Sequence, residues 1–227
     1  MEKQISTETR EKKVLSMVFL TISLCILASN FLSSINTVIS PGTTGYIIFV
    51  GAFTLLNIII AISAVILAIK CRGVFSIIGG IFLAIATLMN LVNASFAHAF
   101  TLSLPSLLEF LIGNNIIEDP ATLFMFYGIP GFVSIIVNFL CLVAYILLAA
   151  GTRTSKIFKT TIVATGAFFL FMTVANNFIV PVLFNPDMLS IYFNIYNALD
   201  SAIQIVIIAI CIFEYISANR QAKSCQE

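Results

Sequence analysis

One acidic residue lies deep inside an apolar stretch of this sequence, and its neighbours are polar. Asp200 stands about 11 residues into a stretch near 188–216, roughly 16 Å along a helix from the start of that stretch. Polar residues recur beside it at intervals of three or four positions: Asn194, Asn197, Ser201 and Gln204. This spacing predicts a polar helix face with Asp200 at its edge.

An ionisable residue at this depth in a membrane is costly, at about 2.5–3.5 kcal/mol on insertion scales. No Lys, Arg or His lies in the middle of an apolar stretch, so the sequence shows no counter-ion for Asp200. Three states are open to it: protonated and hydrogen-bonded, ionised in a wet cavity, or ionised beside a bound cation. We favour a functional role, because a lone buried acid is hard to retain as a helix contact alone.

Every other apolar stretch contributes at least one asparagine: Asn30, Asn57, Asn90, Asn93, Asn138, Asn176 and Asn177. If these side chains converge, they form a polar cavity that opens to the outside and closes on Phe, Leu and Ile at its base. Such a cavity suits a cation or a small polar solute. The alternative is that Asn and Gln only hydrogen-bond neighbouring helices together. The candidate binding residues are Asp200, Asn197, Gln204, Asn138 and Asn176.

Motifs of known catalytic and metal sites are missing from the sequence. His98 is the one histidine, and there is no H-E-x-x-H, G-x-S-x-G or P-loop. We therefore expect no enzyme activity, no metal site and no cofactor. None of the five cysteines falls in an outer loop. Cys71 and Cys225 lie where a lipid could be attached, although plain thiols are the interpretation we favour.

Composition defines the kind of element that must position Asp200. The chain has 227 residues, of which 60% are hydrophobic and 9% charged, and its mean hydropathy is +1.09. A soluble domain is about 25% charged, so a free soluble domain is excluded and a lipid bilayer is the expected surrounding. The net charge of +1 argues against nucleic acid as a partner, because phosphate binding needs a concentrated basic face.

Six apolar stretches are long enough to cross about 30 Å of hydrocarbon as helices. They lie near 14–35, 46–69, 74–96, 121–150, 157–184 and 188–216. Backbone groups find no water in a bilayer, so these stretches must be helical, and the alternating pattern of a β-barrel is missing. We predict an all-α, polytopic six-helix bundle in one transmembrane domain, 14–216, between tails at 1–13 and 217–227.

The basic residues predict the orientation of the bundle. All 11 Lys and Arg fall on one side of the six crossings, whereas the other side holds only acidic charges: Glu109, Glu118, Asp119 and Asp187. Cytoplasmic loops of membrane proteins carry the excess of Lys and Arg. We therefore expect both termini in the cytoplasm and a cell membrane as the location.

Prolines and glycines predict breaks in the outer half of the bundle. The longest loop, about 97–120, contains an apolar segment near 103–113 with Pro105 at its start, which predicts a short interfacial helix. Asp119 and Pro120 are typical of the start of the fourth helix. Proline inside a helix removes a hydrogen bond, so we expect a kink in the fourth helix at 128–131 and another near Pro181.

Two functional classes fit this pattern. In the first, the chain is a small transporter or channel-like protein that binds a cation or small polar solute near Asp200. In the second, it is a non-catalytic membrane subunit, scaffold or sensor, with a membrane-protein partner or a second copy of itself. Polar side chains that converge on one cavity favour the first class, whereas dispersed pairs between neighbouring helices favour the second.

Overall fold

The computed structural model describes residues 2–36, 44–113, 129–179 and 186–224, with side chains over slightly narrower ranges. Its elements are α1 (Glu2–Asn36), α2 (Thr44–Lys70), α3 (Val74–Gly113), α5 (Ile129–Gly151), α6 (Lys156–Val174), the π-helical turn η3 (Ala175–Ile179) and α8 (Pro186–Ser224). The described residues contain no strand, which confirms the all-α prediction.

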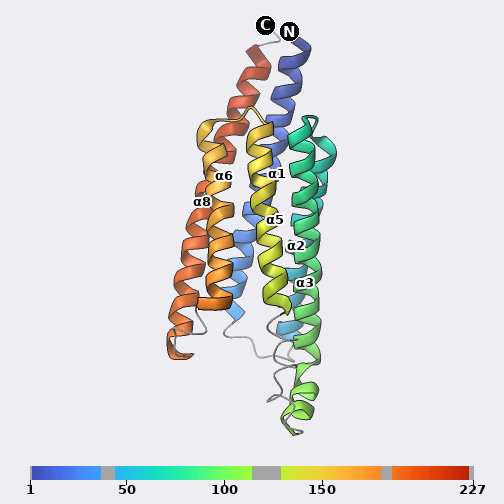
Figure 1. The fold of residues 1–227 in the computed structure, drawn as a ribbon, viewed down its shortest axis with the longest axis vertical. Coiled ribbons are helices and arrows are strands. Elements are labelled where there is room, and N and C mark those ends of the chain that lie inside the picture. Colours follow the sequence, from blue (N-terminus) through green and yellow to red (C-terminus); the bar gives the residue numbers. More distant parts are fainter. Residues whose placement is uncertain (1, 37–43, 114–128, 180–185, 225–227) are drawn as a thin grey trace.

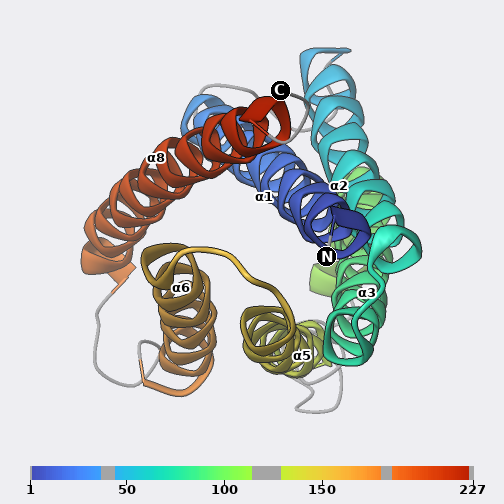
Figure 2. The ribbon, with the colours of Figure 1, turned by 90° about the horizontal axis from the view of Figure 1, so that it is seen from above.

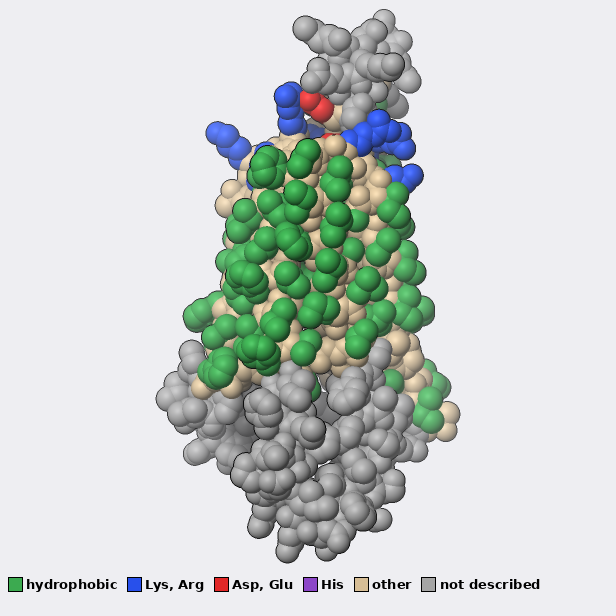
Figure 3. Space-filling model, turned by 45° about the vertical axis from the view of Figure 1, so that its right-hand side comes forward, with side chains coloured by type: hydrophobic (Ala, Val, Ile, Leu, Met, Phe, Trp, Pro, Cys, Tyr) green, Lys and Arg blue, Asp and Glu red, His purple; other side chains and the backbone are tan. Residues whose placement is uncertain are grey.

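The prediction of six membrane-spanning helices is also confirmed. Six helical segments are long and apolar enough to cross a membrane: Glu8–Ser33, Thr44–Lys70, Val74–Ala94, Pro130–Gly151, Lys156–Phe178 and Asn194–Ala222. Each overlaps one predicted stretch. Hydrophobic side chains cover the visible face of the bundle below a group of Lys and Arg side chains (Figure 3). An apolar outer surface of this kind is what a multi-pass membrane protein presents to lipid.

The helices form a ring in which each packs on its neighbours in sequence (Figure 2). Short turns join α2 to α3 and α5 to α6, so these pairs are antiparallel hairpins. The ring closes where α1 packs extensively on α8, whereas the contact between α6 and α8 is the least extensive of those between neighbouring spans. Because six crossings return the chain to its starting side, α1 begins and α8 ends at the same end of the bundle (Figure 1).

The hydrophobic core lies in the half of the bundle nearest that end, which we call the basic end because all 11 Lys and Arg lie there. All six spans contribute to it. Its fully buried large side chains are Leu15, Leu67, Leu83, Leu148, Phe158 and Ile162. These side chains fill the centre of the bundle near the basic end at the density typical of a protein core.

Small residues let α2 and α3 approach closely. The sequence pattern Gly80-x-x-x-Ala84 facing Ala64-x-x-x-Ala68 is typical of close-packing helix faces. A Cβ added to Gly80 would lie 2.8 Å from the Ala68 Cα, so the two backbones touch at this point and the interpretation is confirmed. The helices α2 and α3 therefore pack closely against each other.

The predicted breaks are only partly found. The segment 103–113 is helical, but it continues α3 without interruption. The prediction that it forms a separate short helix is therefore wrong. The physical reason is that Pro105 removes one hydrogen bond, while the leucines around it favour helix. In the fourth span, Pro130 occupies the first turn of α5, where a proline is well tolerated. Residues 121–128 and Pro181 lie outside the described residues, so the kinks at 128–131 and near Pro181 stay predictions.

Residues 2–13, which we expected as a tail, belong to α1. Charged side chains of this segment form ion pairs with other elements at the basic end. Lys12 Nζ lies 3.0 Å from Glu214 Oε2, and the Ser155 N–H donates to Glu214 Oε1 at 3.0 Å. The position of Glu214 near the end of the sixth apolar stretch predicts a side chain close enough to reach the membrane interface. In the structure this side chain is instead 1% exposed. The carboxylate stays inside since two partners from other elements satisfy it there.

Cys71, in the turn between α2 and α3, is a poor candidate for modification. Burial raises the pKa of its thiol to about 11, and the nearby Glu11 carboxylate adds to this increase. We expect Cys71 to react with N-ethylmaleimide at pH 7.5 at least 100-fold more slowly than a thiol of pKa about 8.5, because its thiolate fraction is about 300-fold lower. Mass spectrometry of the labelled native protein measures this rate. Glu11→Gln should speed the reaction, and a rate equal to that of an exposed thiol would contradict the prediction.

Candidate polar cavity around Asp200

Helix α8 places the Asp200 side chain inside the bundle, where it is 5% exposed. Its Oδ2 accepts a hydrogen bond of 2.9 Å from Asn30 Nδ2 on α1, and its Oδ1 accepts one of 2.9 Å from Gln204 Nε2. The Asn30 amide also donates to Ser201 Oγ at 3.3 Å. Amide donors on both oxygens stabilise a carboxylate and leave lone pairs on each oxygen for a ligand.

Asp200 is part of the wall of a cavity of about 260 Å³ that lies on the side of the hydrophobic core away from the basic end. All six spans contribute side chains to its wall. The polar ones are Ser29, Asn57, Thr87, Asn90, Asn138, Cys141, Tyr145 and Asp200. The others, apart from Gly166, are apolar or aromatic: Ile22, Ile26, Phe53, Ile60, Leu83, Val137 and Phe169. The cavity is therefore amphipathic, with one acid among amides, hydroxyls and rings.

The charge of Asp200 is not balanced by a basic side chain. Among the described residues, no Lys, Arg or His lines the cavity. The two ion pairs of the described residues, Lys12–Glu214 and Arg153–Glu8, both belong to the basic end. The described residues also contain no group of three or more metal-ligating side chains of the His, Cys, Asp and Glu types. A positive ligand in the cavity would thus meet one full negative charge and several neutral acceptors.

Asparagines also connect neighbouring helices in pairs. Asn90 Nδ2 on α3 donates to Asn57 Oδ1 on α2 at 3.3 Å, and Asn138 Nδ2 on α5 donates to Thr173 Oγ1 on α6 at 3.0 Å. Asn93 Nδ2 donates to Ser134 Oγ at 3.3 Å and so connects α3 to α5. Such bonds between membrane helices contribute about 0.6–2 kcal/mol each. The asparagines therefore hold the ring together while three of them face the cavity.

The predicted site residues take different places. Asp200 and Asn138 both line the cavity. Gln204 is almost fully buried and donates a hydrogen bond to Asp200, but it does not line the cavity. Asn197 lines a separate groove of about 590 Å³ between α1 and α8, and Asn176 lies in η3, where it contributes to neither space. The structure thus brings Asp200, Gln204 and Asn138 together and leaves the other two apart.

Several residues of the cavity were not among the five candidates. Asn57 and Asn90 of the wall, and Asn30, which donates to Asp200, could have been chosen, because their residue type was noted in the sequence. No pattern in the sequence marks Phe53, Tyr145 and Phe169, since an aromatic residue in an apolar helix is equally suited to lipid or to the core.

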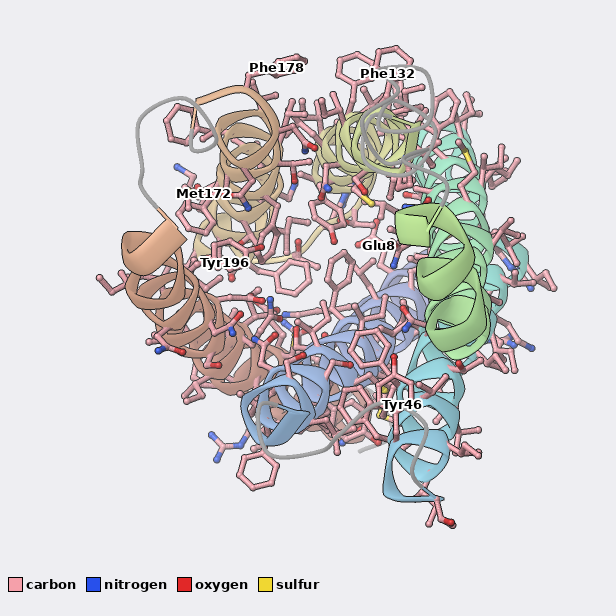
Figure 4. The ribbon with its side chains drawn as sticks, turned by 90° about the horizontal axis from the view of Figure 1, so that it is seen from below. Glu8, Tyr46, Phe132, Met172, Phe178 and Tyr196 are labelled. Atoms are coloured by element: carbon pink, nitrogen blue, oxygen red, sulfur yellow. The ribbon has the colours of Figure 1, made fainter. Side chains whose placement is uncertain are left out.

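Helices α6 and α8 contact each other less extensively than the other neighbouring spans, and side chains of both helices lie between them (Figure 4). Met172 of α6 and Tyr196 of α8 lie on the sides that face each other, whereas Phe132 and Phe178 point away from the bundle (Figure 4). Flexible Met and amphipathic Tyr side chains adapt to irregular gaps.

The fold defines an all-helical, multi-pass membrane protein with an acid-containing cavity at its centre. No family model, curated protein or solved structure matches the chain. What the cavity does must therefore be inferred from the chemistry of its own residues.

Proposed function

We propose that the protein is a small transporter or channel-like protein that binds a cation or small polar solute in the cavity at Asp200. The observation that carries this proposal is a 95% buried carboxylate that lines a central cavity without a basic partner among the described residues. In a low-dielectric surrounding an uncompensated carboxylate attracts a cation or a proton strongly. The same group can therefore select a charged ligand.

A structural role alone accounts poorly for an acid at this position. If position 200 were asparagine, its Oδ1 could still accept from Asn30 on α1, and its Nδ2 could donate to Gln204 once the Gln204 amide turned its oxygen toward it. The helices could thus be held together without an acid, and the charge of the acid is costly within a membrane. A ligand that pairs with this charge removes the cost, which supports a binding function.

We propose that both termini face the cytoplasm and that the protein resides in the cell membrane. The support is the common position of all 11 Lys and Arg at the end of the bundle where α1 begins and α8 ends. With this orientation, the hydrophobic core separates the cavity from the cytoplasm and the cavity lies nearer the outside. We further propose that the chain acts without catalysis, cofactor or metal, with lipid as its surrounding.

The proposal is tested by flux measurements in proteoliposomes loaded with sodium, potassium or ethylammonium chloride. We expect the wild-type protein to carry at least one of these cations and Asp200→Asn to lower that flux at least tenfold, because the isosteric amide removes the charge while its oxygen can still accept from Asn30. Asn93→Ala is the matched control, since it breaks an α3–α5 hydrogen bond outside the cavity wall. Unchanged flux and pH dependence in Asp200→Asn would remove the acid from the mechanism.

The second candidate is a non-catalytic membrane subunit, scaffold or sensor. It is favoured by the hydrogen-bonded pairs Asn57–Asn90, Asn93–Ser134 and Asn138–Thr173, each of which bridges two neighbouring helices. In that case a membrane-protein partner or a second copy of the chain would contact the outer surface. No flux above that of protein-free liposomes, together with co-purification of such a partner, would favour this class.

A further inference from the structure

We propose that the cation held at Asp200 is a small organic ammonium ion with an apolar body, and not a bare metal ion. This inference rests on the proposed function and specifies the class of its ligand. Three independent features of the cavity carry it: its volume, the balance of donors and acceptors in its wall, and its aromatic side chains.

The volume of the cavity is too large for a dehydrated metal ion alone. At about 30 Å³ for each water molecule in the liquid, 260 Å³ corresponds to about eight to nine waters. A hard cation such as Ca²⁺ needs six to eight oxygen ligands at about 2.3–2.6 Å. The wall supplies one carboxylate, and much of it is hydrocarbon that cannot replace a hydration shell. An organic cation of several heavy atoms fills such a space better.

The polar groups of the wall are arranged to accept hydrogen bonds from a ligand. Both N–H groups of the Asn138 amide are engaged, with Ser134 O and Thr173 Oγ1, so the group that Asn138 offers is its Oδ1. The Asn57 amide donates to Phe53 O, and Asn90 donates to Asn57 Oδ1. The carboxylate of Asp200 and the Oδ1 of Asn138 therefore match the N–H donors of an alkylammonium group, which has no acceptor of its own.

Aromatic side chains supply the remaining part of the match. Phe53 of α2, Tyr145 of α5 and Phe169 of α6 belong to the wall, on three different sides of the ring. The face of an aromatic ring attracts a cation within about 6 Å and also packs against its methylene or methyl groups. Ile22, Ile26 and Leu83 extend the apolar surface toward the core. An ammonium ion with a short alkyl body would use the acid and the rings at once.

Thermal unfolding of the purified full chain in detergent distinguishes the ligand classes. We expect ethylammonium chloride, at 100-fold above its Kd, to raise the Tm by about 5–10 °C. Sodium and potassium chloride at the same ionic strength should not do so. Asp200→Asn should abolish the shift. Phe169→Leu should weaken ammonium binding about 3- to 30-fold, the range of a cation–π contact, whereas Phe168→Leu, outside the wall, is the matched control with unchanged binding.

The outcomes separate this inference from the function on which it rests. If sodium or potassium stabilises the wild type through Asp200 and ethylammonium does not, the ammonium class is overturned and a cation site at Asp200 stands. If Phe169→Leu binds ammonium as tightly as Phe168→Leu, the aromatic contribution is overturned. If Asp200→Asn keeps the full ammonium shift, the proposed function fails together with the inference.

Discussion

Lys12→Met should lower the free energy of unfolding by about 3–5 kcal/mol, because it leaves the carboxylate of Glu214 buried without its cation. The two charged atoms lie 3.0 Å apart, and their side chains are 13% and 1% exposed. Glu214→Gln should cost less. The Lys12 ammonium can move toward water at the basic end, and the glutamine oxygen can still accept from the Ser155 N–H.

The double variant Lys12→Met with Glu214→Gln separates the pair from its surroundings. It removes both charges, so we expect it to recover most of the stability that Lys12→Met loses. Unfolding in mixed detergent–SDS micelles measures each free energy. Arg153→Met is the matched control: it breaks the exposed Arg153–Glu8 pair, whose arginine is 77% exposed, and should cost less than about 1 kcal/mol. Equal losses in Lys12→Met and Arg153→Met would show that burial does not strengthen the first pair.

Gly80→Val should lower the free energy of unfolding by about 2–3 kcal/mol, since it drives side-chain atoms into a backbone that cannot yield locally. Even a Cβ at this position would lie 2.8 Å from the Ala68 Cα and 3.1 Å from the Ala68 N. The only relief is to separate α2 from α3, which would also enlarge the cavity that both helices line. The same unfolding assay detects the loss.

The control for Gly80 lies on the same hairpin. A Cβ added to Gly51 of α2 meets no atom within 4 Å, so Gly51→Ala should be neutral or stabilising by up to about 1 kcal/mol through helix propensity. A Gly80→Val variant as stable as Gly51→Ala would mean that the α2–α3 contact is not close in the folded protein.

Part of the cavity could be predicted because burial of an acid is visible along one helix. Asp200 and Gln204 are four residues apart, so their hydrogen bond follows from helix geometry alone. Asn30, the other partner of Asp200, is 170 residues away and could be chosen only once α1 was known to pack on α8. Asn197 shares the polar face of α8 but lies at the groove between α1 and α8, because a helix face is wider than the part that reaches the centre.

For Glu214, the sequence predicted an exposed position and the structure has a buried one. Its position near the end of a span predicted a side chain that reaches the membrane interface. Lys12 and Ser155, which come from other elements, provide enough partners to hold it inside.

The amino-acid sequence by itself determined six apolar helices and the common position of all its cations. Both depend only on the length of each stretch and on the order of charges along the chain. The tertiary structure alone decided which polar side chains meet at Asp200, that aromatic rings join them, and that Glu214 is buried. These depend on which helices are neighbours and how each is rotated about its axis, and in a chain where nearly every face is apolar the hydrophobic pattern does not specify that rotation.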